Sequence, residues 1–243
     1  MDTTQVKTKL PQCWQDLQDT LENGVDRVIL FGPSGIGKTY AGMHIGNVEA
    51  GAFRLVCTED MTNMEVTGSF MPDGKGGFNW LNGSALKAWE GNGVNGGRLI
   101  VDEIDKASGD VYATLLAMLD SPESASWEHP STGRVHKPKT GFSAIMTTNV
   151  ENMGELPTAL TDRFPIKIRI NEPHPDALLR LSADLRGFAV AMADAGDRRI
   201  SLRAFMAYDA LRAKLGEERS AVLTFGDRAQ SILDAIQINK VGK

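Results

Sequence analysis

One glycine-rich segment constrains the fold of this chain more than any other, and it matches the pattern Gly-x-x-x-x-Gly-Lys-Thr: Gly32-Pro33-Ser34-Gly35-Ile36-Gly37-Lys38-Thr39. It follows the apolar, β-rich stretch 27–31 and precedes residues 40–45, which can continue as a helix. A strand, a glycine loop and a helix N-terminus in this order present backbone N–H groups to a phosphate. Lys38 can reach the β- and γ-phosphates, and the Thr39 hydroxyl can bind Mg²⁺. The segment therefore predicts binding of a nucleoside triphosphate.

A second strand is predicted where residues 98–101 run as a continuous apolar stretch into two adjacent carboxylates, Asp102 and Glu103. Ligands of an open α/β sheet bind at this carboxyl edge. We expect Asp102 to hold Mg²⁺, directly or through water, and Glu103 to polarise the water that attacks the γ-phosphate. An Asp-Glu pair alone is a weak signal, since most such pairs are solvated. The buried strand before it and the phosphate loop about 65 residues earlier favour the catalytic interpretation.

Two more strands are predicted downstream, over residues 142–149 and 165–170. The first ends at Asn149, which could position the attacking water or contact the γ-phosphate. An Asn at a strand end is more often a turn former, so its place in the series of strands carries this prediction. The second alternates between apolar and basic residues, as is typical of an edge strand with one solvated face.

The composition is that of an ordinary globular protein of 243 residues, with 42% hydrophobic residues and a net charge of −5. The negative charge argues against a general nucleic-acid binder. No apolar run approaches the roughly 20 residues that cross a bilayer. The first five residues do not resemble a secretion signal, and Cys13 and Cys57 are isolated thiols, as expected in a reducing compartment. We therefore expect a cytoplasmic protein that does not enter a membrane.

The order of these elements, followed by Leu160-Thr161-Asp162-Arg163-Phe164, resembles that of AAA+ ATPases. More narrowly, residues 25–215 are similar to the MoxR and dynein-related branch, which includes the CbbQ, NorQ and GvpN activators and the CobS cobaltochelatase subunit. The resemblance implies that Arg163 is an arginine finger that reaches the γ-phosphate bound by the neighbouring subunit, where a cation stabilises phosphoryl transfer. The alternative is a salt bridge from Arg163 to Asp162 or to another local carboxylate.

The resemblance also implies a second sensor. Residues 201–205 are similar to the start of the family's lid helix, where Arg203 would contact the γ-phosphate from the same subunit; the nearby Arg198 and Arg199 make this assignment less specific. After Glu172 the pattern predicts helices only, the first of them capped by Asp176. The expected fold is an α/β P-loop core with a parallel sheet over residues 1–171, followed by an all-helical lid over residues 172–243.

Two insertions distinguish this branch from simpler AAA+ proteins. Residues 68–80 are predicted to form a hairpin, because a turn rich in Gly, Pro and Asp separates short aromatic strands. They look like the family's helix-2 insert, and residues 126–138 resemble its presensor hairpin, with Gly133 in the turn. Composition alone would favour plain surface loops, but the positions relative to the ATPase motifs favour the hairpins. We expect partner contacts in the first hairpin, from Phe70, Phe78 and Trp80.

Three functional classes remain open. The resemblance favours an ATP-hydrolysing homo-oligomer, a hexameric ring that remodels or activates a client or a separate von Willebrand-type partner, in metal insertion or enzyme maturation. A nucleic-acid-associated AAA+ motor or loader is the alternative; it needs a basic pore surface, and Lys75 alone marks the first hairpin tip. A nucleotide-gated scaffold with little turnover is disfavoured by Glu103 and Asn149. The expected cofactors are ATP and Mg²⁺, and ATP is favoured over GTP because no Asn-Lys-x-Asp motif occurs.

Overall fold

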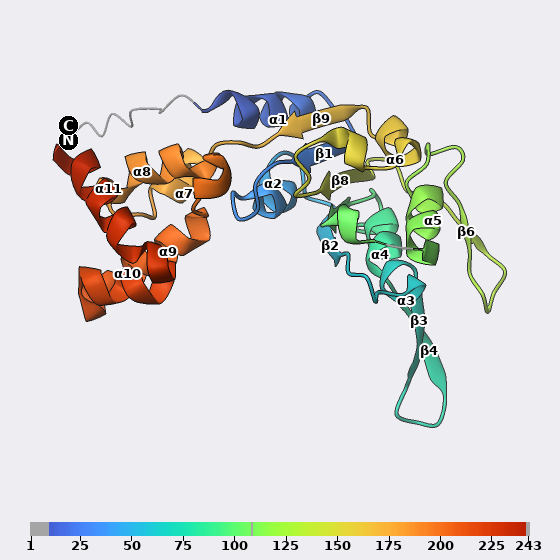
Figure 1. The fold of residues 1–243 in the computed structure, drawn as a ribbon. Helices are drawn as coiled ribbons and strands as arrows, with labels where there is room; N and C mark the ends of the chain where they lie inside the picture. Colours follow the sequence, from blue (N-terminus) through green and yellow to red (C-terminus); the bar gives the residue numbers. More distant parts are fainter. Residues whose placement is uncertain (1–9, 108, 242–243) are drawn as a thin grey trace, which may run out of the picture. The chain divides into compact units, whose positions relative to one another are not determined.

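The computed structural model describes residues 10–107 and 109–241. They form two compact units, which are described separately below. We call Asp16–Gly32 together with Lys38–Arg169 the core unit, and residues 10–15, 33–37 and 170–241 the lid unit. Figure 1 labels their helices and strands.

The core unit is built on a parallel sheet with the strand order β2-β5-β8-β1-β9. Its strands are β1 (Arg27–Phe31), β2 (Ala52–Val56), β5 (Arg98–Asp102), β8 (Ser143–Thr147) and β9 (Ile166–Arg169). The central strands β1, β5 and β8 are almost continuously buried, which explains why they are apolar runs. Strand β9 lies at the edge, where its alternating pattern leaves one face solvated. The predicted α/β fold with a parallel sheet is confirmed.

Helices cover both faces of this sheet (Figure 1). The helical segments of the core unit are α2 (Lys38–His44), α3 (Asn63–Val66), α4 (Ser84–Glu90), α5 (Gly109–Met118), α6 (Thr158–Arg163) and two 3₁₀ turns, η1 (Ile104–Lys106) and η2 (Met153–Glu155). Helix α2 approaches one face so closely that a Cβ added to Gly42 would lie 3.2 Å from the Ile100 side chain. The next residue along β5, Val101, belongs to the core cluster on the other face, together with Trp89 of α4 and Leu115 of α5. The alternation along β5 follows the pleat of the strand.

Both predicted hairpins form within the core unit. Strands β3 (Gly68–Pro72) and β4 (Phe78–Asn82) pair in antiparallel register, and α4 follows directly after them. Strands β6 (Trp127–Glu128) and β7 (Val135–His136) form the second hairpin. Gly133 lies in its turn with φ of 62°, a conformation that favours glycine.

The lid unit contains helices and no strand among its described residues. They are α7 (Pro175–Leu178), α8 (Ala183–Ala193), η3 (Gly196–Arg198), α9 (Leu202–Leu215), α10 (Glu217–Phe225), η4 (Gly226–Arg228) and α11 (Ala229–Val241), while α1 (Gln12–Glu22) has residues in both units. Large buried side chains such as Leu185, Phe205 and Tyr208 fill the core of this unit. The predicted helical segment after the sheet is confirmed, and the division at residues 171 and 172 stays a prediction.

One detail of the lid prediction is wrong. The N-cap of α7 is His174, whose Nδ1 accepts a hydrogen bond of 3.2 Å from the backbone N–H of Asp176. Pro175 occupies the first turn and holds the residue before it in extended backbone, so the helix begins two residues earlier than predicted. No helix among the described residues is long and apolar enough to cross a membrane.

Candidate nucleotide-binding site

The phosphate loop turns on glycines with positive φ. Gly32, Gly35 and Gly37 have φ of 122°, 71° and 116°, which a residue with a Cβ adopts only under strain. The loop ends where α2 begins at Lys38, so the helix N-terminus follows the turn directly. The first N–H groups of a helix have no intrahelical acceptor and can bind an anion. The geometry of an anion-binding loop is therefore encoded in the backbone.

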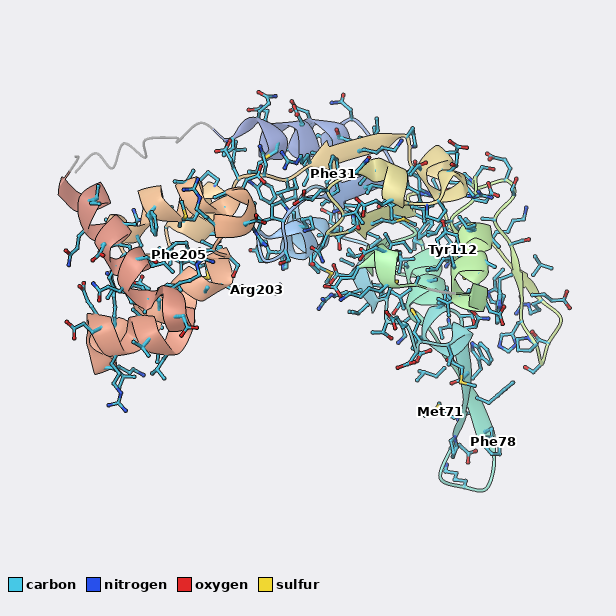
Figure 2. The ribbon with its side chains drawn as sticks, viewed as in Figure 1. Phe31, Met71, Phe78, Tyr112, Arg203 and Phe205 are labelled. Carbon is cyan, nitrogen blue, oxygen red and sulfur yellow. The ribbon has the colours of Figure 1, made fainter. Side chains whose placement is uncertain are left out.

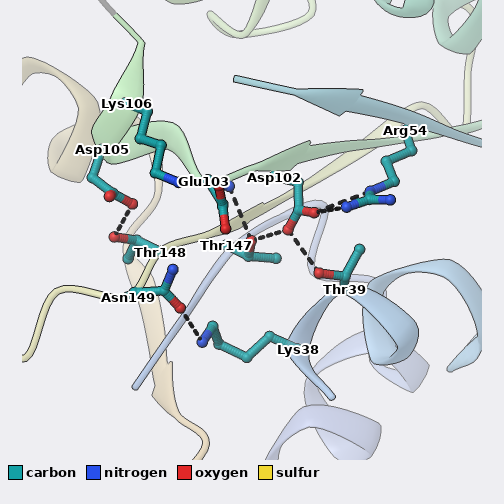
Figure 3. A network of polar contacts seen from close by, with 10 residues as sticks. All are labelled: Lys38, Thr39, Arg54, Asp102, Glu103, Asp105, Lys106, Thr147, Thr148 and Asn149. Carbon is teal, nitrogen blue, oxygen red and sulfur yellow. Dashed lines mark hydrogen bonds and ion pairs between the residues drawn. The ribbon is translucent and has the colours of Figure 1, made fainter. Parts of the chain in front are cut away.

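Lys38 is buried, and its ammonium group connects the loop to the neighbouring strand β8. Its Nζ donates to the carbonyl oxygen of Gly32 at 2.7 Å and to Oδ1 of Asn149 at 2.9 Å. Figure 3 shows this second contact at the carboxyl end of the sheet. The structure thus brings the predicted phosphate-binding lysine and the predicted sensor asparagine together, although 111 residues separate them in the chain.

Asp102 ends strand β5 at the centre of the same polar network (Figure 3). Its Oδ1 accepts a hydrogen bond of 2.7 Å from the Thr39 hydroxyl and another from Thr147. Its Oδ2 accepts from Nε of Arg54 at 3.0 Å and also from Nη2. Burial by itself would raise the pKa of Asp102, but the hydrogen bonds from Thr147, Thr39 and Arg54 outweigh it and lower the pKa. The carboxylate is therefore held ionised.

Glu103 occupies a special backbone position. Its φ of 58° and ψ of 48° place it in the left-handed region, and it is the one non-glycine residue with positive φ among the described residues. Its N–H donates to Oγ1 of Thr147 at 3.2 Å, and its carboxylate pairs with Lys106 one turn of η1 later. Strained backbone of this kind occurs at functional sites, where the surroundings enforce it. Here the left-handed turn follows the end of β5, so that Glu103 is partly exposed whereas the residues of β5 are buried.

The donor set suits Mg²⁺. Thr39 donates its hydroxyl proton to Asp102, which leaves the oxygen lone pairs for a cation. A hydroxyl and a carboxylate are the hard oxygen ligands that Mg²⁺ takes, with nucleotide phosphates and water completing its shell. No cluster of three or more His, Cys, Asp or Glu side chains is found in the described part of the chain, so these residues do not form an all-protein metal cage. Thr39 and Asp102 are therefore the residues that would hold the ion.

Arg163, the predicted finger, lies at the end of α6 and pairs with a carboxylate of its own chain. Its Nη2 contacts Oδ2 of Asp120 at 3.0 Å, and Nη1 donates to the carbonyl oxygen of Ala159 at 2.8 Å. The local salt bridge that the sequence left open is thus present, with Asp120 in place of Asp162. The role of Arg163 toward a neighbouring subunit stays a prediction.

In the lid unit, a different arginine contacts the phosphate loop. Arg199 donates through Nη2 to the carbonyl oxygen of Ser34 and lies 3.3 Å from its hydroxyl oxygen. The Arg203 side chain (Figure 2) approaches Gly35, with Cδ 3.8 Å from the position of a Cβ on that glycine. The sequence indicated Arg199 only as a nearby arginine that makes the assignment of Arg203 as the sensor less specific. The sensor role of Arg203 stays a prediction.

Arg54, Lys106 and Thr147 were not predicted. Thr147 is the last residue of β8, two residues before Asn149. Its place at the carboxyl edge of the sheet is the one signal by which it could have been predicted as a site residue. Arg54 offers none, because an arginine on an edge strand is usually a solvated residue. Only the pairing of β2 with β5 brings it to Asp102.

A parallel P-loop sheet with paired acidic residues after one strand and a polar sensor after the next defines a nucleoside triphosphatase. The sequence model of the AAA domain (dynein-related subfamily) matches residues 27–164, more than half of the chain, and the chain therefore belongs to this family. It is an ATPase. The comparison thus confirms the resemblance to AAA+ proteins and leaves the narrower similarity to CbbQ, NorQ and their relatives a prediction. No curated protein sequence matches this chain.

Solved structures share the fold at low sequence identity. The structure of NtrX from Brucella abortus in complex with ADP has a TM-score of 0.54 at 16% identity over 84% of this chain. The same protein in complex with ATP has a TM-score of 0.51 at 14% identity over 94% of this chain. This chain covers 51% and 66% of those chains, respectively. At this identity the likeness concerns the fold alone.

Proposed function

We propose that this chain is a MoxR-type AAA+ ATPase that forms a homo-oligomeric, hexameric ring and uses ATP and Mg²⁺ to remodel or activate a partner protein in the cytoplasm. The partner is a separate client or a von Willebrand-type protein. The single observation that carries this proposal is the set of aromatic contacts between the two inserted hairpins, the second of which leads along the chain to the nucleotide site.

An aromatic cluster joins the hairpins. The Trp80 ring on β4 lies 5.1 Å from Phe70, 5.4 Å from Trp127 and 4.9 Å from His129, measured between ring centroids. Such pairs hold two surface elements in a defined orientation. The second hairpin leads into β8, which is followed by Asn149 and its contact with Lys38. A change at the γ-phosphate can therefore reach the second hairpin along the chain, and the first hairpin through the ring contacts of Trp80.

The first hairpin exposes apolar side chains on both strands, two of which are labelled in Figure 2. Met71, Phe78 and Leu81 are 48%, 66% and 55% exposed. Grouped apolar residues on a projecting element favour contact with protein. Its turn carries Lys75 and Asp73, whose charges cancel, and this balance does not favour a nucleic-acid partner.

Ring formation is tested with the Glu103→Gln variant, which should bind ATP without hydrolysing it. Light scattering with ATP and Mg²⁺ is expected to give a mass about six times the 26.3 kDa of one chain, and a smaller mass without nucleotide. Lys38→Ala, which removes the phosphate-binding ammonium group, serves as the matched control and should not assemble. A mass of one chain under all conditions would refute the ring.

The trans role of Arg163 is tested by mixing two inactive variants. Glu103→Gln keeps the finger and loses the base, whereas Arg163→Ala keeps the base and loses the finger. In a mixed ring, an Arg163→Ala subunit with intact Glu103 can face the finger of a Glu103→Gln neighbour. Recovery of ATPase activity on mixing is expected. No recovery in rings shown to contain both variants would exclude a finger in trans.

A further inference from the structure

Arg54 contacts the predicted metal-binding carboxylate of Asp102, although the predicted ATPase mechanism gives Arg54 no role. It lies on β2, and both Nε and Nη2 of its guanidinium donate to the same oxygen of Asp102, Oδ2 (Figure 3). The other oxygen, Oδ1, is already taken by the hydroxyl groups of Thr39 and Thr147. The Arg54 side chain is 49% exposed, whereas that of Asp102 is 4% exposed. A half-exposed cation thus covers one oxygen of a buried carboxylate.

The occupied oxygen matters for metal binding. Mg²⁺ gives up its water reluctantly and usually contacts carboxylates partly through bound water molecules, which donate to carboxylate oxygens. Because Thr39 donates its proton to Oδ1, its own oxygen keeps lone pairs that could bind a cation on that side. Oδ2 is the acceptor left for a metal-bound water, and Arg54 fills it. Arg54 and that water therefore require the same lone pairs.

We propose that Arg54 is a positioning residue that neutralises Asp102 in the metal-free site and gives up Oδ2 to a Mg²⁺-bound water when the metal–nucleotide complex binds. The inference rests on the proposed use of Mg²⁺. An ionised carboxylate without a partner is costly to bury, so Arg54 keeps Asp102 ionised and oriented between binding events. Half of its side chain is in water, and the guanidinium can leave without opening a cavity in the core.

If Arg54 assists the metal instead of competing with it, its removal has the opposite effect on Mg²⁺ binding. If Arg54 stayed on Asp102 beside the metal and only oriented the carboxylate, removing it would weaken Mg²⁺ binding. If Arg54 competes with the metal, removing it strengthens Mg²⁺ binding. The sign of the change therefore decides between the two.

The test measures ADP affinity over a range of free Mg²⁺ concentrations, with a fluorescent ADP derivative, so the readout does not depend on hydrolysis. In Arg54→Gln, the Mg²⁺ concentration that gives half of the full gain in affinity is expected to fall about 5- to 10-fold, the size of one charge-assisted hydrogen bond near a surface. Arg54→Lys keeps the charge and loses the two-pronged geometry, so a smaller fall is expected. Arg134→Gln makes the same change on the exposed second hairpin and should behave as wild type.

The outcomes separate this inference from the proposed role of Mg²⁺. If Mg²⁺ changes ADP affinity in the wild type, but both Arg54 variants need as much Mg²⁺ as the wild type or more, the competition is excluded and the metal role stands. If Mg²⁺ has no effect on ADP affinity in the wild type, both fail. Thermal unfolding of each variant checks that it is folded, and Arg54→Lys decides the question if Arg54→Gln is not.

Discussion

Because the backbone of Glu103 is left-handed, glycine should stabilise the fold relative to alanine at this position, whereas it usually destabilises it. Glu103→Ala and Glu103→Gly both remove the carboxylate and its contact with Lys106, so their difference isolates the backbone. An L-residue in this region costs roughly 1–2 kcal/mol relative to its ordinary conformations. Glycine escapes that cost but loses about 0.5–1 kcal/mol through the greater freedom of its unfolded chain. We expect Glu103→Gly to be about 0.5–1 kcal/mol more stable than Glu103→Ala.

A matched control changes the same two residue types on ordinary helical backbone. Ala113 is exposed in the middle of α5, in the same core unit. There Ala113→Gly should lower the free energy of unfolding by about 1 kcal/mol, since glycine is a poor helix former. The opposite signs at positions 103 and 113 are the diagnostic result.

The assay is urea unfolding without nucleotide, followed by circular dichroism and tryptophan fluorescence. A change of stability shifts the midpoint of the transition and leaves its slope unchanged. If Glu103→Ala proves as stable as Glu103→Gly or more so, the left-handed conformation is not strained and the reasoning is refuted. If the prediction holds, the wild-type chain carries a strained residue at this position, as is typical of functional sites.

Three further predictions concern other parts of the core unit. Lys38→Ala should weaken ATP binding on the order of 100-fold, since it removes charge-assisted hydrogen bonds in a buried site, and fluorescent-nucleotide titration would expose a smaller loss. Trp80→Ala should increase hydrogen exchange across residues 127–136, because the aromatic contacts between the hairpins are lost; unchanged exchange would show that the hairpins are independent. Burial, with the nearby Asp102, raises the pKa of Cys57 to about 12, so iodoacetamide at pH 8 should leave it unmodified until the chain unfolds; mass spectrometry of a digest would reveal earlier labelling.

The sequence predicted the core because its signals are local. Strands β1 and β5 are apolar runs that end at the residues that carry the chemistry, and the hairpin around Lys75 has its own turn residues. Each of these features depends on neighbours within a few residues. Such patterns do not depend on how the rest of the chain is arranged, and the predicted strands are present in the sheet.

The rest depends on contacts between distant segments. Asp102 and Arg54 are 48 residues apart, and Asp120 and Arg163 are 43 apart, so no spacing rule indicates either pair. Helix α10 escaped prediction because Gly216, with φ of 80°, ends one helix and directly precedes another. Sequence patterns predicted the site residues, whereas the partners of these residues became visible only in the fold.

These partners follow one rule. Four predicted charged groups of the core unit are already paired within that unit: Asp102 with Arg54, Glu103 with Lys106, Lys38 with Asn149 and Arg163 with Asp120. In all three ion pairs at least one side chain is a third or more exposed, and exposed pairs contribute little net stability. A bound nucleotide or a neighbouring subunit therefore replaces these three ion pairs at little cost in stability. We expect ligand binding to exchange partners within a site that is already charged and ordered, so that the energy of the triphosphate contacts remains for moving the hairpins.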